Sequence, residues 1–251
     1  GFIGDMTNME TIYSIKEFFD KIINSQNLES RDDKYYINTS TRSNYIFNSS
    51  IEGIEDSDLI LLIGTNPRYE ATILNSRIRK TYIKKNVPIY SIGDLGDLTY
   101  PYEFFENSTS VVKNIFGDKH ELSVKIKNSK KPLIILGQSI LKQKSGTYVF
   151  EELKKYLNNN SMITNDWNPL NVISNDSSTV GALDLEIISK DSSNEIFEKL
   201  EKNTFEILFL IGQDNLDFKK KNEFIIYIGS HGDRGASIAD VILPSAAFTE
   251  Q

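Results

Sequence analysis

Five short apolar runs, each closed by a glycine, are the feature that most limits how this chain can fold. They occupy residues 58–64, 87–93, 131–137, 206–212 and 223–229, with sequences such as DLILLIG and EILFLIG. Apolar residues follow one another in these runs instead of alternating with polar ones, which is typical of strands buried on both faces of a parallel sheet. The runs therefore predict the α/β class, with mostly parallel sheets.

Helix signals lie between these runs. Thr7 followed by Glu10 has the form of a capping box, and Ile12, Ile15, Phe19 and Ile22 follow it at helical spacing, which predicts an amphipathic helix to about residue 23. A second helix is expected over residues 148–157. A second capping box at residues 192–195 leads a short helix that carries Ile196, Phe197 and Leu200.

Asn66 and Pro67 begin the helix that we expect after the first run. Asparagine is a favoured helix cap, and proline is favoured at the first helical position. This helix should extend to about residue 85. Its predicted inner face carries Ile73, Leu74, Ile78 and Tyr82.

Two α/β units are predicted from the repeated rhythm of strand and helix. Strand, helix and strand at this spacing form a right-handed crossover unit, and both halves of the chain contain the pattern. A last short strand is expected at residues 240–243 (DVIL), whereas residues 24–50 are polar and predicted as mostly loop. We place the boundary in the charged stretch near residue 128, which gives Rossmann-like units over residues 1–128 and 129–251.

The absence of cysteine excludes several kinds of site. A chain of 251 residues with no cysteine has no disulfide, no thiolate zinc site, no cysteine-ligated iron–sulfur cluster and no cysteine nucleophile. Its two histidines, His120 and His231, lie far apart in the sequence, so a histidine-rich metal site is also excluded. We therefore predict no metal site in this chain.

Charge and composition narrow the partners and the source. The net charge of −7 argues against a nucleic-acid binder, which would carry a basic surface. The longest apolar runs are far shorter than the ~20 residues of a membrane span. The chain has 33 Ile and 23 Asn but only 6 Ala, which indicates an AT-rich genome, either of an organelle or of a bacterium. It begins without Met, so we expect a processed chain or a fragment.

The sequence Gly64-Thr65-Asn66-Pro67 is the first candidate for a binding loop. It lies between a predicted strand and a predicted helix, where open α/β sheets bind ligands and where a helix N-terminus favours anions. The alternative is a well-capped turn with no ligand, which the pattern alone favours.

A glycine-rich stretch at residues 229–235 (GSHGDRG) is a weaker candidate. It has neither form of the phosphate-binding glycine motifs, and a strand is expected soon after it in place of a helix. His231 and Asp233 lack a nucleophile on a G-x-S-x-G elbow. His120 is expected on the surface. No residue is therefore assigned a catalytic role.

Basic residues gather on the predicted helix after Pro67. They are Arg68, Arg77, Arg79, Lys80, Lys84 and Lys85. Such a stretch is either the solvated face of the helix or a contact surface for an acidic protein subunit. On an acidic chain, a protein partner is favoured over nucleic acid, and we take Arg68, Arg77, Arg79 and Lys80 as the candidate interface residues.

Several long stretches are familiar in sequence. Residues 42–80 contain IEGIEDSDLILLIGTNPRYEATILNSRIRK, residues 166–173 read DWNPLNVI, and residues 231–250 read HGDRGASIADVILPSAAFTE. In this order, and with the shorter matches at residues 97–100 and 181–185, the chain resembles the large iron–sulfur subunit of respiratory complex I (NADH:ubiquinone oxidoreductase). The resemblance covers nearly the whole chain.

The resemblance implies a particular portion of that subunit. The family carries its iron–sulfur clusters in an N-terminal portion, and its C-terminal portion is molybdopterin-oxidoreductase-like but holds no molybdenum cofactor in most members. This chain resembles only the C-terminal portion, and both of its ends look truncated. In the related pterin enzymes, the loop that matches Gly64–Pro67 approaches the nucleotide of the cofactor, so these four residues are candidates for a vestigial cofactor loop.

Three functions follow as hypotheses. The first is a non-catalytic structural domain in the peripheral arm of complex I, without a cofactor of its own, in contact with other peripheral-arm subunits and the cluster-bearing portion of the same subunit. It would reach the membrane only through the complex, on the matrix side of the mitochondrial inner membrane and encoded by the organelle, or on the cytoplasmic face in a bacterium. The second is a cofactor-binding fragment of an active molybdopterin-dependent oxidoreductase. The third is a stand-alone nucleotide-binding module.

Overall fold

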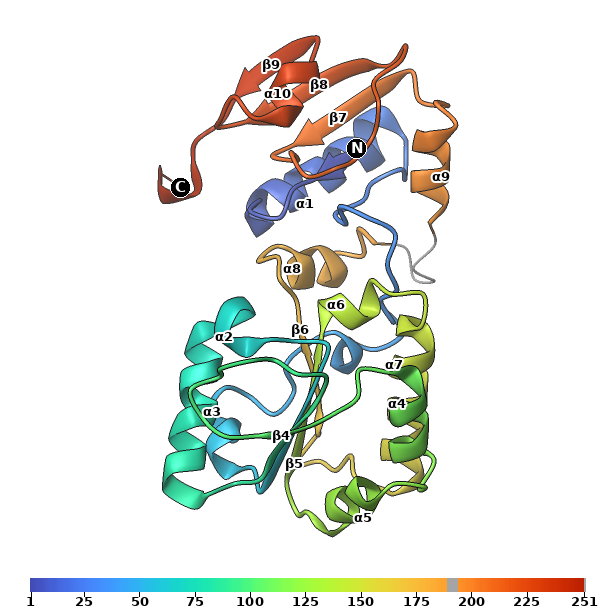
Figure 1. The fold of residues 1–251 in the computed structure, drawn as a ribbon. Helices are drawn as coiled ribbons and strands as arrows, with labels where there is room; N and C mark the ends of the chain where they lie inside the picture. The colour runs from blue at the N-terminus through green and yellow to red at the C-terminus, as the bar shows by residue number, and fades with distance from the viewer. Residues whose placement is uncertain (189–193, 251) are drawn as a thin grey trace. The chain divides into compact units, whose positions relative to one another are not determined.

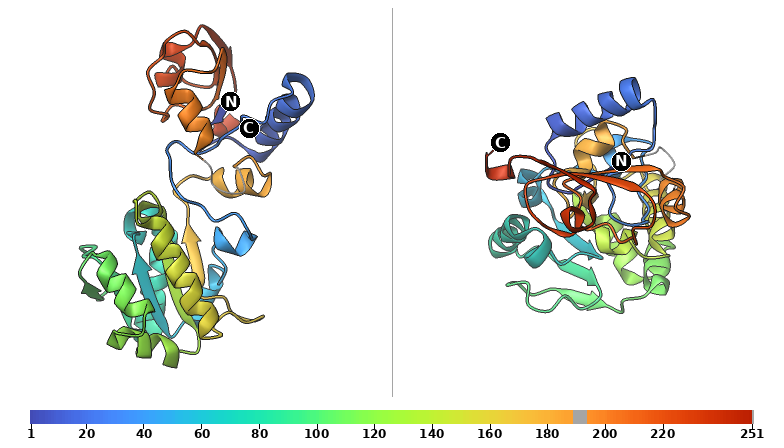
Figure 2. Two further views of the ribbon diagram at one scale, coloured as in Figure 1. Left: turned by 90° about the vertical axis from the view of Figure 1, so that its right-hand side faces the viewer. Right: turned by 90° about the horizontal axis from the view of Figure 1, so that it is seen from above.

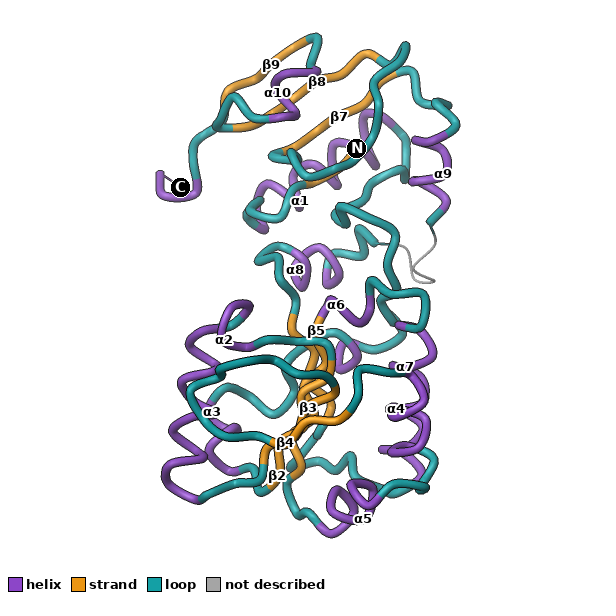
Figure 3. The backbone as a smooth tube through the Cα atoms, viewed as in Figure 1, coloured by secondary structure: helices purple, strands orange, loops and turns teal. Residues whose placement is uncertain are grey.

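The chain divides into two compact units. The computed structural model describes residues 1–188 and 194–250. One unit, here called the inserted unit, is Thr41–Asn175, and the other, the split unit, combines Gly1–Ser40 with Asp176–Gln251. The helices and strands follow one another along the chain as shown in Figures 1 and 3.

In the split unit the elements are β1 (Phe2–Ile3), α1 (Met9–Phe18), the π-helix η1 (Phe19–Ile23), α8 (Thr179–Asp184), α9 (Glu195–Glu201), β7 (Ile207–Ile211), β8 (Phe224–Gly229), α10 (Arg234–Ile238), β9 (Val241–Pro244) and the 3-10 helix η4 (Phe248–Glu250). In the inserted unit they are the 3-10 helices η2 (Arg42–Asn44) and η3 (Glu52–Asp56), then β2 (Leu59–Ile63), α2 (Pro67–Glu70), α3 (Thr72–Lys85), β3 (Ile89–Ile92), β4 (Glu103–Phe105), α4 (Thr109–Phe116), α5 (Glu121–Asn128), β5 (Pro132–Gly137), α6 (Gln138–Leu141), α7 (Gly146–Asn159) and β6 (Leu170–Ile173).

The boundary expected near residue 128 is not where the chain divides. Strand β5, which lies beyond that position, pairs with β2 along its whole length, so both belong to one sheet. At the other end, Phe2 and Ile3 of β1 pair with Leu210 and Ile211 of β7. Long-range strand pairing therefore makes one unit an insertion in the sequence of the other. The charged stretch near residue 128 does not indicate this division.

The inserted unit is a doubly wound sheet. Its strand order is β4-β3-β2-β5-β6, and every pairing between these strands is parallel. Helices α2 and α3 cover one face of the sheet, and α4 and α7 cover the other (Figure 1); Figure 2 shows the same layers from two further sides. Strand β2 is buried at all five positions, as its apolar run predicted.

The split unit holds a second parallel sheet, with the order β1-β7-β8-β9. Alternate residues supply two cores. Phe2, Leu208 and Leu210 pack with Phe197 of α9 on one face, whereas Ile3 and Ile211 pack with residues of α1 and α8 on the other. The predicted α/β class with mostly parallel sheets is confirmed, and the five apolar runs are β2, β3, β5, β7 and β8.

Two helices differ from the prediction in which side faces the core. Asn8, not Thr7, caps α1, because its Oδ1 accepts a hydrogen bond from the backbone N–H of Thr11 at 2.9 Å. The helix ends at Ile23 as expected, but its last five residues form a π-helix. A π turn holds more residues than an α turn and so rotates the later side chains. Ile22, predicted on the apolar face, is exposed as a result.

Helix α3 shows a similar phase change. The backbone breaks at Ala71, between α2 and α3, where φ is −151° and ψ is 68°. The buried side chains of α3 are Asn75, Ile78 and Thr81. Ile73, predicted to face the core, is instead 72% exposed.

Other sequence predictions are confirmed by the elements observed. Helix α7 buries the four residues predicted to face inward, Val149, Leu153, Tyr156 and Leu157. Strand β9 lies within one residue of its predicted bounds. Helix α9 carries its three predicted apolar residues inward. Ser192 and Ser193 of the predicted capping box lie outside the described residues.

A buried ion pair organises the polar segment that precedes the inserted unit. Arg31 is fully buried, and its Nη2 lies 2.7 Å from Oε2 of Glu29, which is 2% exposed. The same guanidinium donates to the carbonyl of Tyr35 at 2.8 Å and lies 5.3 Å above the ring of Phe197. Such a pair stabilises a fold only while both partners and their hydrogen bonds are in place.

Replacing Arg31 by Met should therefore destabilise the split unit strongly. The change leaves the Glu29 carboxylate buried without its cation, a loss worth ~3–5 kcal/mol of unfolding free energy. Urea unfolding followed by circular dichroism measures it. Arg79→Met is the matched control: Arg79 is exposed, and its side chain makes no ion pair or hydrogen bond among the described residues, so its effect should stay within ~0.5 kcal/mol. Equal effects of the two variants would contradict the assignment.

Candidate functional site

The carboxyl ends of β2 and β5 mark where a ligand would bind in the inserted unit. Strand β2 leads to β3 on one side, and β5 continues to β6 on the other, so the strand order reverses between β2 and β5. Open α/β sheets bind their ligands in the crevice outside such a switch point. Gly64–Pro67, the predicted loop, lies there directly after β2.

The loop has the geometry of a capped turn. Gly64 adopts a φ of +60°, which favours glycine. Asn66 caps α2: its Oδ1 accepts from the backbone N–H of Arg68 at 3.1 Å, and its Nδ2 donates to the carbonyl of Leu95 at 3.0 Å. Pro67 is the first residue of the helix. The cap and the proline position are thus as predicted.

Residues after β5 close the crevice from the opposite side. A Cβ on Gly137 would lie 2.1 Å from the carbonyl oxygen of Gly64, and a Cβ on Gly64 would lie 2.5 Å from Cβ of Ile140. The hydroxyl of Ser139 donates to the same Gly64 carbonyl. A cavity lined by Gly64, Ile92 and Ile140 at these strand ends holds about 80 Å³, whereas ligand pockets commonly hold ~300–1,000 Å³.

Several donors of the loop are bonded within the chain. The carboxylate of Glu70 accepts from Oγ1 of Thr65 at 2.7 Å and from the backbone N–H of Asn66 at 3.2 Å. Glu70 therefore places a negative charge where an anionic nucleotide would need these donors. The small cavity and the carboxylate of Glu70 are both unfavourable for a dinucleotide cofactor at this loop.

A second cleft lies at the carboxyl ends of β1, β7 and β8 in the split unit. It holds about 360 Å³ and is lined by residues that include Thr7, Gly212, Asp214 and His231. Asp214 is the best-connected of these, because its carboxylate accepts from Tyr227 Oη at 2.9 Å and from the backbone N–H of Gly235 at 2.7 Å. Burial, followed by this hydrogen bond, raises the pKa of Tyr227. The carboxylate thus anchors the loop to the sheet.

The glycine-rich stretch is followed by a helix that was not predicted. Helix α10 (Arg234–Ile238) lies between β8 and β9, so the expected direct connection between strands is corrected. A Cβ on Gly235 would lie 2.5 Å from the ring of Tyr227, so glycine here permits close packing of helix and strand. His231 is exposed, and its Nδ1 lies 2.9 Å from the hydroxyl of its neighbour Ser230. No hydrogen bond joins it to Asp233 among the described residues.

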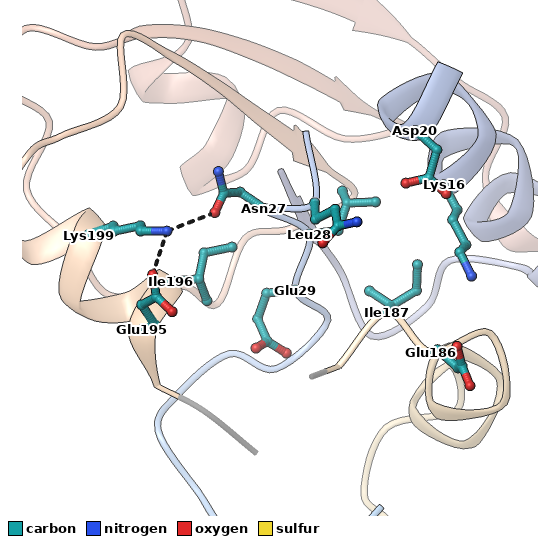
Figure 4. A pocket seen from close by; sticks show the side chains of 11 residues that line it. Lys16, Asp20, Asn27, Leu28, Glu29, Glu186, Ile187, Glu195, Ile196 and Lys199 are labelled. Atoms are coloured by element: carbon teal, nitrogen blue, oxygen red, sulfur yellow. Dashed lines mark hydrogen bonds and ion pairs between the residues drawn. The ribbon is translucent and has the colours of Figure 1, made fainter. Parts of the chain in front are cut away.

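Figure 4 shows a third hollow, on the split unit, of about 420 Å³. Its charged side chains come from separate elements, and several of them form ion pairs or hydrogen bonds within the chain. Lys199 bonds to Glu195 at 2.7 Å and to Oδ1 of Asn27 at 3.3 Å, and Lys16 donates to the carbonyl of Leu185 at 2.7 Å. Within residues 1–188 and 194–250, no group of three or more His, Asp or Glu side chains is placed to hold a metal ion.

The candidate interface residues form a cluster around one carboxylate. Oε1 of Glu55 lies 2.7 Å from Arg77 and 2.6 Å from Lys80, and its Oε2 lies 3.4 Å from Lys84. Lys85 donates to the backbone carbonyl of Glu55. Sequence reasoning missed Glu55, although a lone acidic stretch before the first run was visible.

The other two predicted interface residues lie outside this cluster. Arg68 pairs with Asp97 at 2.7 Å. Arg79 is exposed and makes no ion pair among the described residues. His120, expected on the surface, is half-buried: its Nδ1 accepts from the backbone N–H of Leu122 at 3.1 Å, which caps α5, and its ring packs edge-on against Phe105.

Comparison with known proteins identifies the family. The family model for molybdopterin oxidoreductase matches residues 1–251, so the chain belongs to the molybdopterin oxidoreductase family. The NADH-ubiquinone oxidoreductase 75 kDa subunit of Reclinomonas americana is 38% identical over 266 residues, which cover 100% of this chain and 38% of the relative. A subunit of the NADH-quinone oxidoreductase of Rickettsia bellii is 36% identical over 252 residues, covering 100% of this chain and 36% of the relative.

A plant relative extends the pattern. The mitochondrial NADH dehydrogenase (ubiquinone) iron-sulfur protein 1 of Solanum tuberosum is 34% identical over 253 residues, with 100% of this chain and 33% of the relative covered. The chain therefore spans about a third of the length of these relatives. Across the described residues, no helix combines the length and the apolar character needed to cross a membrane.

Gly137→Ala should destabilise the inserted unit, because the added methyl group meets the Gly64 backbone and Cβ of Thr65 at 2.6 Å. Overpacking of this kind costs about 1–3 kcal/mol of unfolding free energy. Gly232→Ala is the control, since a Cβ there meets nothing within 4 Å. Thermal unfolding of both variants tests the closed switch point. A tolerated alanine at position 137 would show that the strand ends can separate.

The Glu55 cluster should make stability depend on pH in the acid range. The hydrogen bond from Lys80, with those from Arg77 and Lys84, lowers the pKa of Glu55 from 4.5 to about 2 against the opposing effect of desolvation. Because the folded pKa lies below the unfolded one, the stabilisation is present above pH 4.5 and is lost as the pH falls through about 2. The melting temperature of the wild type should exceed that of Glu55→Gln at pH 6, and the difference should vanish towards pH 2.

Glu52→Gln supplies the control for this titration. Glu52 lies on the same 3-10 helix, is exposed, and makes no ion pair among the described residues. Its melting temperature should match that of the wild type at each pH. A difference between wild type and Glu55→Gln that stays constant from pH 6 to pH 2 would contradict the role of the ionised carboxylate.

Proposed function

We propose that this chain is a non-catalytic structural domain of an NADH:quinone oxidoreductase of the complex I type. The observation that carries the proposal is the closed switch point of the inserted unit, in a chain whose relatives over its whole length are named as subunits of NADH-quinone and NADH-ubiquinone oxidoreductases. The family implies a pterin cofactor, and the Gly64–Pro67 loop does not fit one. The domain would support electron transfer that runs through iron–sulfur clusters elsewhere in the assembly.

The partners and location belong to the same proposal. The domain would contact other peripheral-arm subunits and the cluster-bearing portion of the same subunit, and would reach the membrane through the assembled complex. The Solanum tuberosum relative is named mitochondrial, which supports a place on the matrix side of the mitochondrial inner membrane. The Rickettsia relative keeps the cytoplasmic membrane face of a bacterium as the alternative.

A cofactor-binding fragment of an active molybdopterin-dependent oxidoreductase is less well supported. Family membership favours it. However, the carboxylate of Glu70 accepts from the Thr65 hydroxyl and the Asn66 backbone N–H. Ser139 and Ile140 contact Gly64 on the other side of the loop. The cleft at the carboxyl ends of β1, β7 and β8 is lined by residues that include Asp5, Asp214 and Asp233, which disfavour an anionic group.

Asn66→Ala in the chain's native host tests the structural role. Loss of the cap should lower the unfolding free energy by ~1 kcal/mol and reduce the amount of assembled complex, while the NADH oxidation rate per assembled complex stays unchanged. A native gel of detergent-solubilised membranes, stained for NADH dehydrogenase activity and probed for this chain, measures both quantities.

Asn114→Ala is the matched control, because Asn114 is exposed on α4 and its side chain makes no hydrogen bond among the described residues. Its complex abundance should equal that of the wild type. Normal abundance of the Asn66→Ala complex with collapsed turnover would overturn the structural role. Migration of the wild-type chain away from the NADH-oxidising band would overturn the proposed membership.

A further inference from the structure

Helix α3 exposes a line of four residues on the side away from its sheet, here called the stripe, and the two residues at its ends are apolar. Ile73 is 72% exposed and Ile83 is 66% exposed. With Ser76 and Lys80 between them, these residues are spaced by three, four and three positions, so they follow one line along the helix. Tyr69 of the preceding α2 is also exposed. The inner face is filled by Asn75, Ile78 and Thr81, so the stripe is not part of the core.

Positive charge in excess surrounds this stripe. Arg77, Lys80 and Lys84 share the single carboxylate of Glu55, and Lys85 donates to its backbone carbonyl. Three cations against one carboxylate leave a surplus of two positive charges around Glu55, and Lys85 also interacts with the carboxylate of Asp56. Because the shared carboxylate holds the three side chains in place, the surface is ordered before any partner arrives, which lowers the entropic cost of binding.

Arg79 adds a cation on the same helix that is exposed and without an ion pair among the described residues. The chain as a whole carries a net charge of −7, so this surface opposes the general charge of the molecule. Such a local excess of one sign favours a partner of the other sign.

We propose that the exposed face of α3 binds an acidic amphipathic helix from another protein subunit. Ile73 and Ile83 would receive the apolar side of that helix, and the cations around Glu55 would meet its carboxylates. Amphipathic helices bind their partners through apolar side chains that repeat at helical spacing. A nucleic acid would use the cations but not the stripe.

A second copy of this chain is a poor occupant of the same face. A twofold contact places the same patch of both copies together. The surplus cations would then face each other across the interface. Charge complementarity therefore points to a different, acidic polypeptide. This inference deepens the proposed function, because it names the surface through which the domain would be held in its assembly.

The test uses the assembled complex in native membranes. A photoreactive phenylalanine analogue replaces Ile83 in one variant and Val124 in a control variant. Val124 is a matched site, since it is an apolar residue that is 59% exposed in the same unit but lies on α5 instead of α3. After irradiation, cross-linked peptides are identified by mass spectrometry. We expect the yield from position 83 to exceed that from position 124 by about tenfold.

The identity of the captured peptide decides the proposal. A peptide from another subunit with acidic residues beside an apolar helical stripe supports it. Capture of a second copy, of lipid or of nucleic acid, or equal yields from the two positions, overturns it. If the chain is absent from the NADH-oxidising band, the proposed function fails instead, and the two failures are thereby distinguished.

Charge reversal supplies a second readout. Arg79→Glu should lower the cross-link yield from position 83 about fivefold, because it places a like charge opposite the acidic partner. Lys113→Glu, at an exposed lysine of α4 without an ion pair among the described residues, should leave the yield unchanged. Equal yields in the two charge variants would count against an acidic partner.

Discussion

The close approach of Gly64 and Gly137 governs the inserted unit. Strands β2 and β5 run parallel and in register, and at their carboxyl ends the Gly64 backbone leaves no room for a Cβ on Gly137, while Ile140 leaves none for a Cβ on Gly64. That approach lets Ile140 and Ser139 of α6 pack onto the Gly64 turn. Side chains of α6 therefore occupy part of the place where a doubly wound sheet would admit a ligand.

Charges in the structure follow the same pattern of internal satisfaction. Glu70 accepts a hydrogen bond from Thr65 in the Gly64–Pro67 turn, and Asp214 accepts one from the backbone N–H of Gly235. Glu29 forms an ion pair with Arg31. Each of these carboxylates is met by donors from its own unit. The cations around Glu55 are the exception, because they outnumber their carboxylate. Donors at the strand ends are bonded within the chain, whereas α3 carries an excess of cations. Both features suit a domain that binds other subunits through its surface.

Local signals were sufficient for part of this account. The apolar run of β2 and the Asn66–Pro67 cap are encoded by adjacent residues, so both could be predicted from the sequence. The unit boundary could not, because β1 pairs with β7 about 200 residues later. The exposure of Ile73 depends on the backbone break at Ala71.

The closed crevice and the buried ion pair also lay beyond the sequence. The first depends on how α6 packs against a turn some seventy residues earlier, and nothing in the run of residues 131–137 indicates it. Arg31 lies in a polar segment predicted as loop, and its burial depends on Phe197, which is distant in the chain. Glu70 left a readable signal, since it lies four residues after the Asn66 cap.

We propose that this domain has a structural role in its complex and binds no pterin cofactor of its own. The most direct measurement is the content of molybdenum, tungsten and pterin per copy of this chain in the complex purified from native membranes. We expect values far below one per chain, because the cavity beside Gly64 is small and the carboxylate of Glu70 already accepts from two donors of the Gly64–Pro67 turn. One metal and its pterin per chain would contradict it.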